Sequence, residues 1–214
     1  MLAYKRNQVE EGICRIVEPD AGEPSPELRT RLKRLLDTDR ARDRSPRSSD
    51  PEDANFAFYS DEAPGSGVEV WFSEYEAFAL LTGLRLMGHE WPQGFAVSMM
   101  RRVRPQLEKE HARILKQDAK KLFDQDEVRR TARAGGMAVD NTDPVFLTIL
   151  SRRDVSNNRA VECSIHRGVK QAWEFVWKEH ERLGPGAVTM FELATTTHRL
   201  SQELARTEPR RRGR

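Results

Sequence analysis

Hydrophobic residues recur every three or four positions through the first forty residues, which predicts two amphipathic helices. Val9 and Ile13 share one face of a helix over residues 6–17. A second helix begins after Ser25, whose hydroxyl can cap it, with Pro26 in its first turn, where no backbone N–H is needed. The apolar stripe of this second helix consists of Leu28, Leu32, Leu35 and Leu36.

A different pattern follows the second helix. The Arg-, Ser- and Pro-rich residues 41–53 predict a mobile loop. Apolar residues then alternate with others through NFAFYS and VEVWFS, and DEAPGSG supplies a turn, so residues 55–73 are predicted to form a β-hairpin. Ser73 and Glu76 form an S-x-x-E capping box that opens a third helix. Gly88 suits the left-handed cap at its end.

The second half of the chain predicts helices around two strands. A helix starts near Phe95, and Pro105 is expected to break or kink it before its apolar face resumes towards Ile114. PVFLTILSR and AVECSIHRG are rich in residues typical of strands. Two helices follow them, the first with Trp173 and Trp177 on one face. These aromatic residues belong either to the core or to a surface that contacts a partner.

These patterns together predict an α+β fold that is mainly helical. We expect a mainly helical region with a β-hairpin over residues 1–116 and a charged linker over residues 117–138. A small module of two strands and two helices, for protein interaction or dimerisation, is expected over residues 139–206. Residues 207–214 form a basic tail.

Composition narrows the classes of partner. The 214 residues include 33% charged residues but carry a net charge of only +2, so a nucleic-acid surface requires local segregation of cations. No apolar run approaches the roughly 18–20 residues that span a bilayer, so no membrane association is expected. Cys14 and Cys163 are the two cysteines and lie far apart, which predicts a reduced, cytoplasmic protein.

The second helix is the candidate DNA-binding element. Its cations lie outside the leucine sector with no acidic residue among them, and guanidinium groups suit both phosphate and guanine. With the preceding helix it forms a helix–turn–helix whose link is longer than the compact form, and the hairpin can act as a wing. The alternative is a solvated helix face on a protein-interaction adaptor that binds no nucleic acid. The candidate residues in this helix are Arg29, Arg31, Lys33 and Arg34.

The order of helix, turn, basic helix, hairpin and helix pair resembles the winged helix–turn–helix of MerR-like transcriptional regulators. The segment FSEYEAFALLTGLRLMGHEWPQGFAVSMMRRVRPQL, residues 72–107, is similar to the helices that follow the wing in that family, and the likeness covers about the first 115 residues. It implies that residues 1–116 form a winged-helix-like, DNA-binding region and that the protein is a bacterial regulator of transcription that binds double-stranded DNA. It also implies that cations at the end of the second of these helices approach the DNA backbone, here Arg101, Arg102 and Arg104. A homodimer is expected because one recognition helix reads few base pairs.

The chain also departs from the MerR-like pattern. FAFYS and VEVWFS stand where the family carries an aromatic–arginine signature at the wing, and no long C-terminal dimerisation helix is evident. No cysteines match the effector-binding cysteines that the family often carries.

A catalytic or metal-binding function is the hypothesis with the least support in the sequence. Cys163 and His166 lie three positions apart on a predicted strand and therefore point to opposite faces. No second His or Cys lies near His89 in the sequence, and no G-x-S-x-G or H-E-x-x-H motif occurs. We therefore expect no catalytic residues, no metal and no cofactor.

Overall fold

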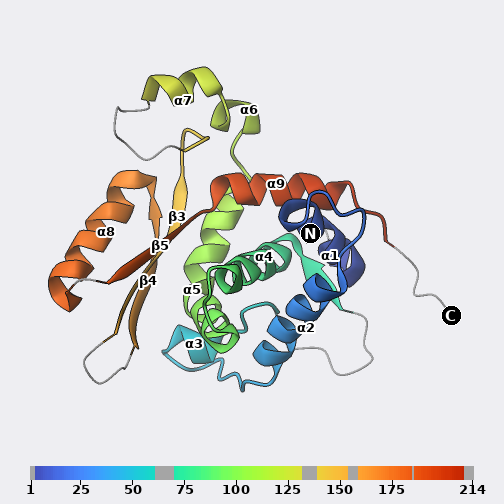
Figure 1. The fold of residues 1–214 in the computed structure, drawn as a ribbon, viewed down its shortest axis with the longest axis horizontal. Coiled ribbons are helices and arrows are strands. Elements are labelled where there is room, and N and C mark those ends of the chain that lie inside the picture. The colour runs from blue at the N-terminus through green and yellow to red at the C-terminus, as the bar shows by residue number, and fades with distance from the viewer. Residues whose placement is uncertain (1–2, 61–69, 132–138, 154–158, 185, 210–214) are drawn as a thin grey trace. The chain divides into compact units, whose positions relative to one another are not determined.

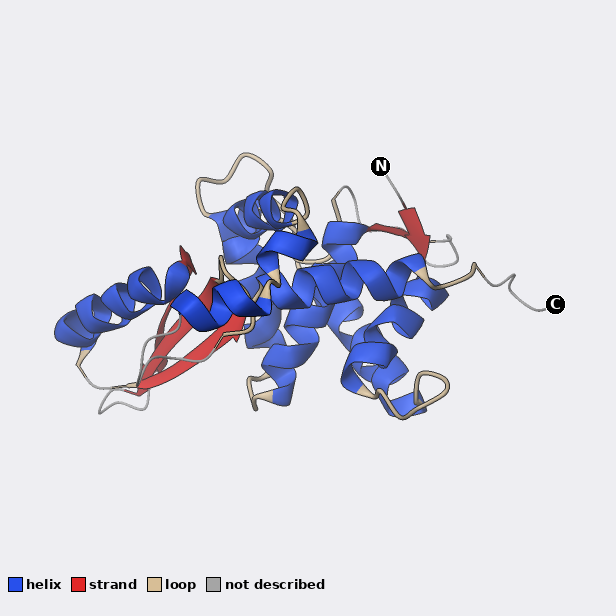
Figure 2. Cartoon of the chain, turned by 90° about the horizontal axis from the view of Figure 1, so that it is seen from above, coloured by secondary structure: helices blue, strands red, loops and turns tan. Residues whose placement is uncertain are grey.

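The computed structural model describes residues 3–60, 70–131, 139–153, 159–184 and 186–209. It has an α+β fold that is mainly helical, as the sequence predicts, with two small antiparallel sheets (Figures 1 and 2). The chain divides into two compact units. Unit 1 is Met1–Glu108 with Arg199–Arg214, and unit 2 is Lys109–His198.

Unit 1 is built from helices around a buried centre. The first two predicted helices are present as α1 (Arg6–Val17) and α2 (Pro26–Arg40). After a short helix, α3 (Pro51–Ala54), come α4 (Glu74–Gly88) and α5 (Gln93–Ile114), which continues into unit 2. The last helix, α9 (Ala194–Ala205), begins in unit 2 and ends in unit 1.

The predicted hairpin over residues 55–73 is wrong in its pairing. The strand β2 (Trp71–Ser73) pairs antiparallel with β1 (Ala3–Lys5) at the N-terminus, with Tyr4 opposite Phe72. Residues 56–59 form no strand, and all four are buried, so they do not alternate between core and solvent as a surface strand does. The predicted turn falls in residues 61–69, which lie outside the described residues.

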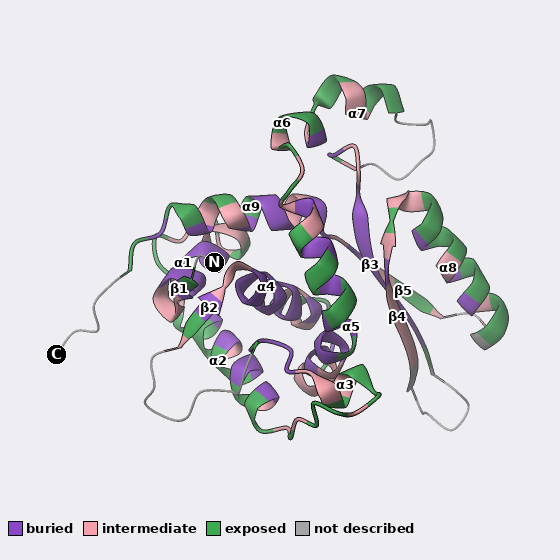
Figure 3. Cartoon of the chain, turned by 180° about the vertical axis from the view of Figure 1, so that it is seen from behind, coloured by how far each residue is buried: buried purple, intermediate pink, exposed green. Residues whose placement is uncertain are grey.

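Helix α4 occupies the centre of unit 1 and is buried along nearly its whole length (Figure 3). Its predicted capping box is present: the Ser73 hydroxyl accepts from Glu76 N at 3.2 Å, and the Glu76 carboxylate accepts from Ser73 N at 2.6 Å. A side chain at Gly83 would place its Cβ 2.9 Å from Phe58 Cζ, so glycine permits this close packing. The predicted left-handed cap at Gly88 is wrong, because Gly88 is the last residue of α4. Near this end of the helix, Glu90 is the residue with a positive φ.

Helix α5 runs through Pro105 without ending there. Proline removes one helical hydrogen bond and therefore costs stability. The apolar side chains of Met100, Val103 and Leu107 are buried on both sides of Pro105, and their packing offsets that cost.

The described residues of unit 2 form three strands where the sequence predicted two. The predicted pair is β3 (Val145–Arg153) and β4 (Arg159–Arg167), and an unpredicted third strand, β5 (Ala187–Glu192), pairs antiparallel with the other edge of β3. Helix α8 (Gly168–Leu183) packs against β3 and β4, as Figure 1 shows. The sequence pattern indicates no strand at the β5 residues, which follow a glycine-containing link.

The described parts of the predicted linker and tail have defined structure. Residues 117–138 include α6 (Ala119–Leu122), where Leu122 is buried, and α7 (Gln125–Thr131), while residues 132–138 lie outside the described part. Thr207, the first residue of the predicted tail, is also buried, and its hydroxyl and carbonyl oxygens accept from Gln8 Nε2.

Candidate nucleic-acid interface

Helix α2 is fixed in orientation by its cap and by its leucines. The Ser25 hydroxyl accepts from Leu28 N at 3.1 Å and donates to the Glu18 carboxylate at 2.7 Å, so the cap is itself held by the end of α1. All four leucines of the predicted stripe are at most 4% exposed. The opposite side of α2 therefore faces away from the core of unit 1.

The cations of α2 are distributed across this outward side. At about 100° per residue, Thr30 lies opposite the leucine stripe, with Lys33 and Arg34 on its two sides. Arg29 and Arg31 lie further round, at opposite borders of the stripe. Arg31 is half-buried, and the other three cations are exposed. The four predicted residues thus form a broad band with Lys33 and Arg34 at its centre.

The central cations of α2 are available for a ligand. Within the described residues, no hydrogen bond or ion pair engages the side chains of Lys33 and Arg34. Arg29 Nε donates to Pro24 O at 3.2 Å, and Arg31 lies 4.0 Å from the exposed Glu27 carboxylate. Exposed pairs of this kind contribute about 1 kcal/mol or less, so binding can replace them at little cost.

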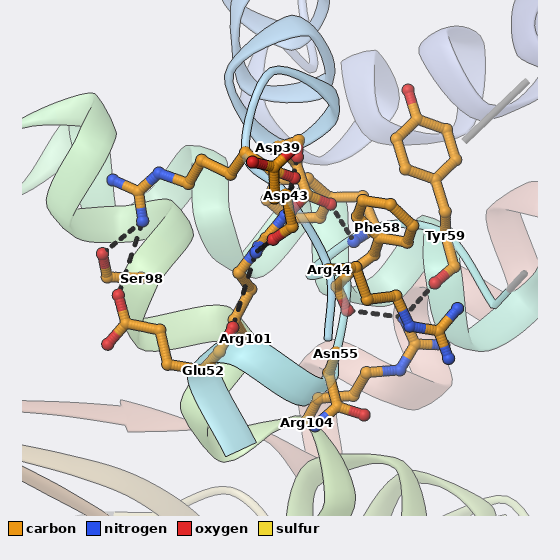
Figure 4. Close-up of polar contacts among 12 residues, drawn as sticks. Asp39, Asp43, Arg44, Glu52, Asn55, Phe58, Tyr59, Ser98, Arg101 and Arg104 are labelled. Atoms are coloured by element: carbon orange, nitrogen blue, oxygen red, sulfur yellow. Dashed lines mark hydrogen bonds and ion pairs between the residues drawn. The ribbon is translucent and has the colours of Figure 1, made fainter. Parts of the chain in front are cut away.

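The second predicted cluster needs correction, because Arg101 lies in the protein interior. It is 2% exposed, and its Nε donates to Asp39 Oδ1 at 2.7 Å (Figure 4). Its Nη atoms donate to the backbone carbonyls of Asp39, Arg42 and Asp43 at 2.7–3.1 Å. Asp39 is fully buried and also accepts from Phe58 N at 2.9 Å. This guanidinium joins α5 to α2 and to the segment after α2.

Arg104 is likewise buried, with 5% of its surface exposed. Its Nη1 donates to the carbonyls of Tyr59 (Figure 4) and of Phe56, the latter at 2.7 Å. Its guanidinium lies 5.2 Å from the Tyr75 ring. Only Arg102 of the three is exposed, and it pairs with Glu52 at 2.9 Å. Arg101 and Arg104 therefore cannot reach a nucleic acid without unfolding their surroundings. The three predicted cations lie within α5 and do not form a cationic surface together.

The same contacts order the segment predicted to be a mobile loop. Arg42 donates to Ser98 Oγ at 2.5 Å and to Gly94 O at 2.9 Å, and Arg44 donates to Ala54 O at 3.1 Å. Arginine suits this task because its planar group supplies five donors in fixed directions. The high arginine content of residues 41–53 thus serves intramolecular hydrogen bonding.

A pocket of about 310 Å³ lies beside the α2 band in unit 1. Its apolar lining comes from Val17, Leu28 and Leu84, and Arg31 shares its rim with Arg85 and His89 of the α4 end. Sequence reasoning missed Arg85 and considered His89 only as a possible metal ligand. The available signal was that Arg85 is the single charged residue in the last three turns of α4. Glu18 and Glu27 also line the rim, so the lining selects no single class of ligand.

The described residues contain no group of three or more His, Cys, Asp or Glu side chains that could hold a metal ion. The buried histidines lie in unit 2. Burial, followed by the charge of His198, lowers the pKa of His111 to about 4, and His198 Nε2 lies 3.1 Å from Ile114 O. His111 is thus neutral at pH 7 and is part of the packed interior of unit 2.

No protein-family model matches the chain, and no curated protein matches it in sequence. Within the described residues, none of the helices combines the length and apolar character needed to cross a membrane.

Proposed function

We propose that unit 1 binds double-stranded DNA through the outward side of α2, as a transcriptional regulator does. The observation that carries the proposal is the band of four cations on a helix whose opposite face is anchored by four buried leucines. Lys33 and Arg34, at the centre of the band, would face base edges in the major groove. Arg29 and Arg31, at its borders, would contact phosphates on the two sides of the groove.

The preceding helix supports this orientation. The α1 end reaches the α2 cap through Glu18, and in the proposed helix–turn–helix α1 would position α2 through this contact. The cation set is narrower than the sequence predicted, because Arg101 and Arg104 are removed from it and Arg102 is paired. The proposal therefore depends on α2 alone.

Fluorescence anisotropy with a labelled duplex, repeated over a salt series, tests this proposal. Binding should weaken as salt rises, with a log–log slope of about 0.9 for each phosphate contact. Arg29→Ala with Arg31→Ala should reduce that slope by about 2, because each loses one phosphate contact. Lys33→Ala with Arg34→Ala should instead reduce discrimination between sequences selected from a random duplex pool and scrambled ones.

The matched control is Arg129→Ala with Arg130→Ala, which removes two exposed cations from α7 of unit 2. This control should bind the duplex as the wild type does. Absence of duplex binding at about 20 mM salt, or equal loss in the control, would contradict the proposal.

A second function, as a protein-interaction adaptor, is favoured by a separate observation in unit 2. Trp173 and Trp177 of α8 are 40% and 63% exposed, and exposed tryptophan is enriched at the centres of protein interfaces. A pull-down treated with nuclease separates the two functions. The adaptor would retain its partner when Arg29 and Arg31 are replaced by alanine.

A further inference from the structure

The two edges of the unit 2 sheet differ in chemistry. The strand order is β4-β3-β5, so β4 and β5 each have one side unpaired within the described residues. Strand β4 carries the charged residues Glu162 and Arg167, whereas the β5 run from Ala187 to Phe191 has no charge. Charged side chains protect an edge strand from pairing with another chain. The uncharged β5 edge lacks that protection.

The orientation of α8 follows from its contacts with the other edge. The Phe175 ring lies 4.7 Å from the ring of His166 on β4, and Arg182 pairs with Glu162 of β4 at 2.6 Å. The buried line of α8, which includes Ala172 and Val176, faces the sheet. At about 100° per residue, Phe175 and Arg182 lie on one side of this buried line, and Trp173 and Trp177 lie on the other side. The two tryptophans therefore lie on the flank of α8 that turns towards β5.

Strand β5 adds apolar side chains on the same face of the sheet. His166 marks the face that α8 covers, and it pairs with Phe146, so Thr148 and Leu150 share that face by alternation. These residues pair with Met190 and Val188 of β5. Val188 is 36% exposed, and α8 packs against β3 and β4. We name Trp173, Trp177, Val188 and Met190, with the β5 edge, the β5–α8 surface.

We infer that the β5–α8 surface binds a second copy of this chain. The two β5 strands would pair antiparallel about a two-fold axis perpendicular to the sheet, which joins two three-stranded sheets into one of six strands. This symmetry keeps both α8 helices on the same face, with their tryptophan flanks directed towards each other over the joined β5 strands. The uncharged edge supplies backbone hydrogen bonds, and the same surface meets itself, as a two-fold interface requires.

The charges on α8 match a second copy in this antiparallel arrangement. Lys170, Trp173, Trp177 and Glu181 follow one another along the exposed flank. A two-fold axis near the middle of α8 places Lys170 opposite Glu181 of the second copy, and Trp173 opposite its Trp177. Lys170 is 3.7 Å from the exposed Glu174, and no ion pair engages Glu181 within the described residues.

The lengths of α8 and β5 allow one two-fold axis to relate both elements to those of the second copy. Helix α8 has 16 residues and β5 has 6, which correspond to about 24 Å and about 20 Å. Residues 184–186 join them at one end, so their midpoints fall at similar distances from that end. One axis can therefore relate both the strand pair and the helix charges. This inference does not depend on DNA binding by α2.

Light scattering and sedimentation of the full chain test the inference. The wild type should have twice the mass of one chain at about 100 μM and dissociate on dilution. Trp177→Ala should raise the dimer dissociation constant about 30-fold or more, because it removes two central aromatic side chains. Val188→Lys should have an effect of similar size by charging the edge. Trp71→Ala is the matched control, since Trp71 is 51% exposed and lies in unit 1. It should leave the mass unchanged.

A charge exchange tests the two-fold arrangement itself. Lys170→Glu and Glu181→Lys should each raise the dissociation constant about 5-fold, and the double variant should recover the wild-type value. Lys178→Glu, on the other flank of α8, is the control for net charge. A monomeric wild type, or a dimer insensitive to both Trp177→Ala and Val188→Lys, would overturn the inference. Single charge variants without recovery in the double variant would overturn the antiparallel arrangement.

Discussion

The arginines of α2 and those of α5 occupy opposite environments, although both groups lie on helices of unit 1. Lys33 and Arg34 extend from a helix whose leucines already satisfy its packing, so their charged groups stay in water. Arg101 and Arg104 reach inward, where Asp39 and a series of backbone carbonyls use nearly every donor they have. A cation cluster in sequence is thus a binding surface only when the fold provides no internal acceptors for it.

The buried arginines of α5 and the exposed cations of α2 are also expected to differ in role: the first stabilise the fold, and the second bind a ligand. Residues 41–60 have few regular backbone hydrogen bonds, so buried carbonyls there need donors from side chains. Arg101 and Arg104 supply them, and their removal should affect folding. The α2 cations make few contacts, and their removal should affect binding only.

The largest effect is expected for Arg101→Ala. It leaves the buried Asp39 carboxylate without its cation and should lower the free energy of unfolding by about 4 kcal/mol. Urea denaturation followed by circular dichroism measures it. Arg102→Ala, one position along and exposed, is the control and should cost less than about 1 kcal/mol. Equal, small losses in both variants would remove the distinction between the two groups.

A somewhat smaller loss is expected for Arg104→Gln. The shorter side chain no longer donates to the Phe56 and Tyr59 carbonyls, which remain buried, and the cost should be about 3 kcal/mol. The same urea titration measures it, and limited proteolysis should show new cleavage within residues 54–60. Unchanged protection of this segment would show that other contacts hold it.

His111 is a further buried side chain of α5, near the end of the helix, and it differs from the buried arginines in being neutral. Its pKa is about 4 in the folded chain and 6.5 when unfolded, so the unfolded chain binds the extra proton between these values. Stability from this group is therefore complete above pH 6.5 and falls as the pH drops towards 4, by about 3 kcal/mol in all. Unfolding measured from pH 7 to pH 4 should show a weaker pH dependence in His111→Gln. An identical pH dependence in the variant and the wild type would contradict the lowered pKa of His111.

The smallest effect on stability is expected for Lys33→Ala with Arg34→Ala. Alanine is a good helix former and these side chains have no partner in the described residues, so unfolding should change by less than about 0.5 kcal/mol. Thermal unfolding and duplex binding should be measured on the same preparation. A large loss of stability would show that these cations contribute to folding, as those of α5 do.

Local patterns in the sequence predicted the elements well where neighbouring residues decide them. The Ser25 cap, the leucine stripe of α2 and the Ser73–Glu76 capping box depend on residues within a few positions of each other, and all are present. Strand pairing could not be predicted from such local patterns. Residues 71–73 have strand character, but their partner lies at the N-terminus, about seventy residues away, and not in the adjacent FAFYS segment. The short β5 was missed because its residues follow a Gly-Pro-Gly link and lead directly into a helix.

The sequence by itself determined the longer helices, where α1, α2 and α4 begin, and which face of α2 is apolar, because these follow from spacing and capping along one element. It did not indicate the short helices α3, α6 and α7. Only the tertiary structure decided which cations are exposed. Arg101 and Arg34 have the same kind of side chain, and the distance in space to buried carbonyls and to Asp39 separates them. That distance depends on how α5 packs against the residues after α2, and no local pattern encodes it.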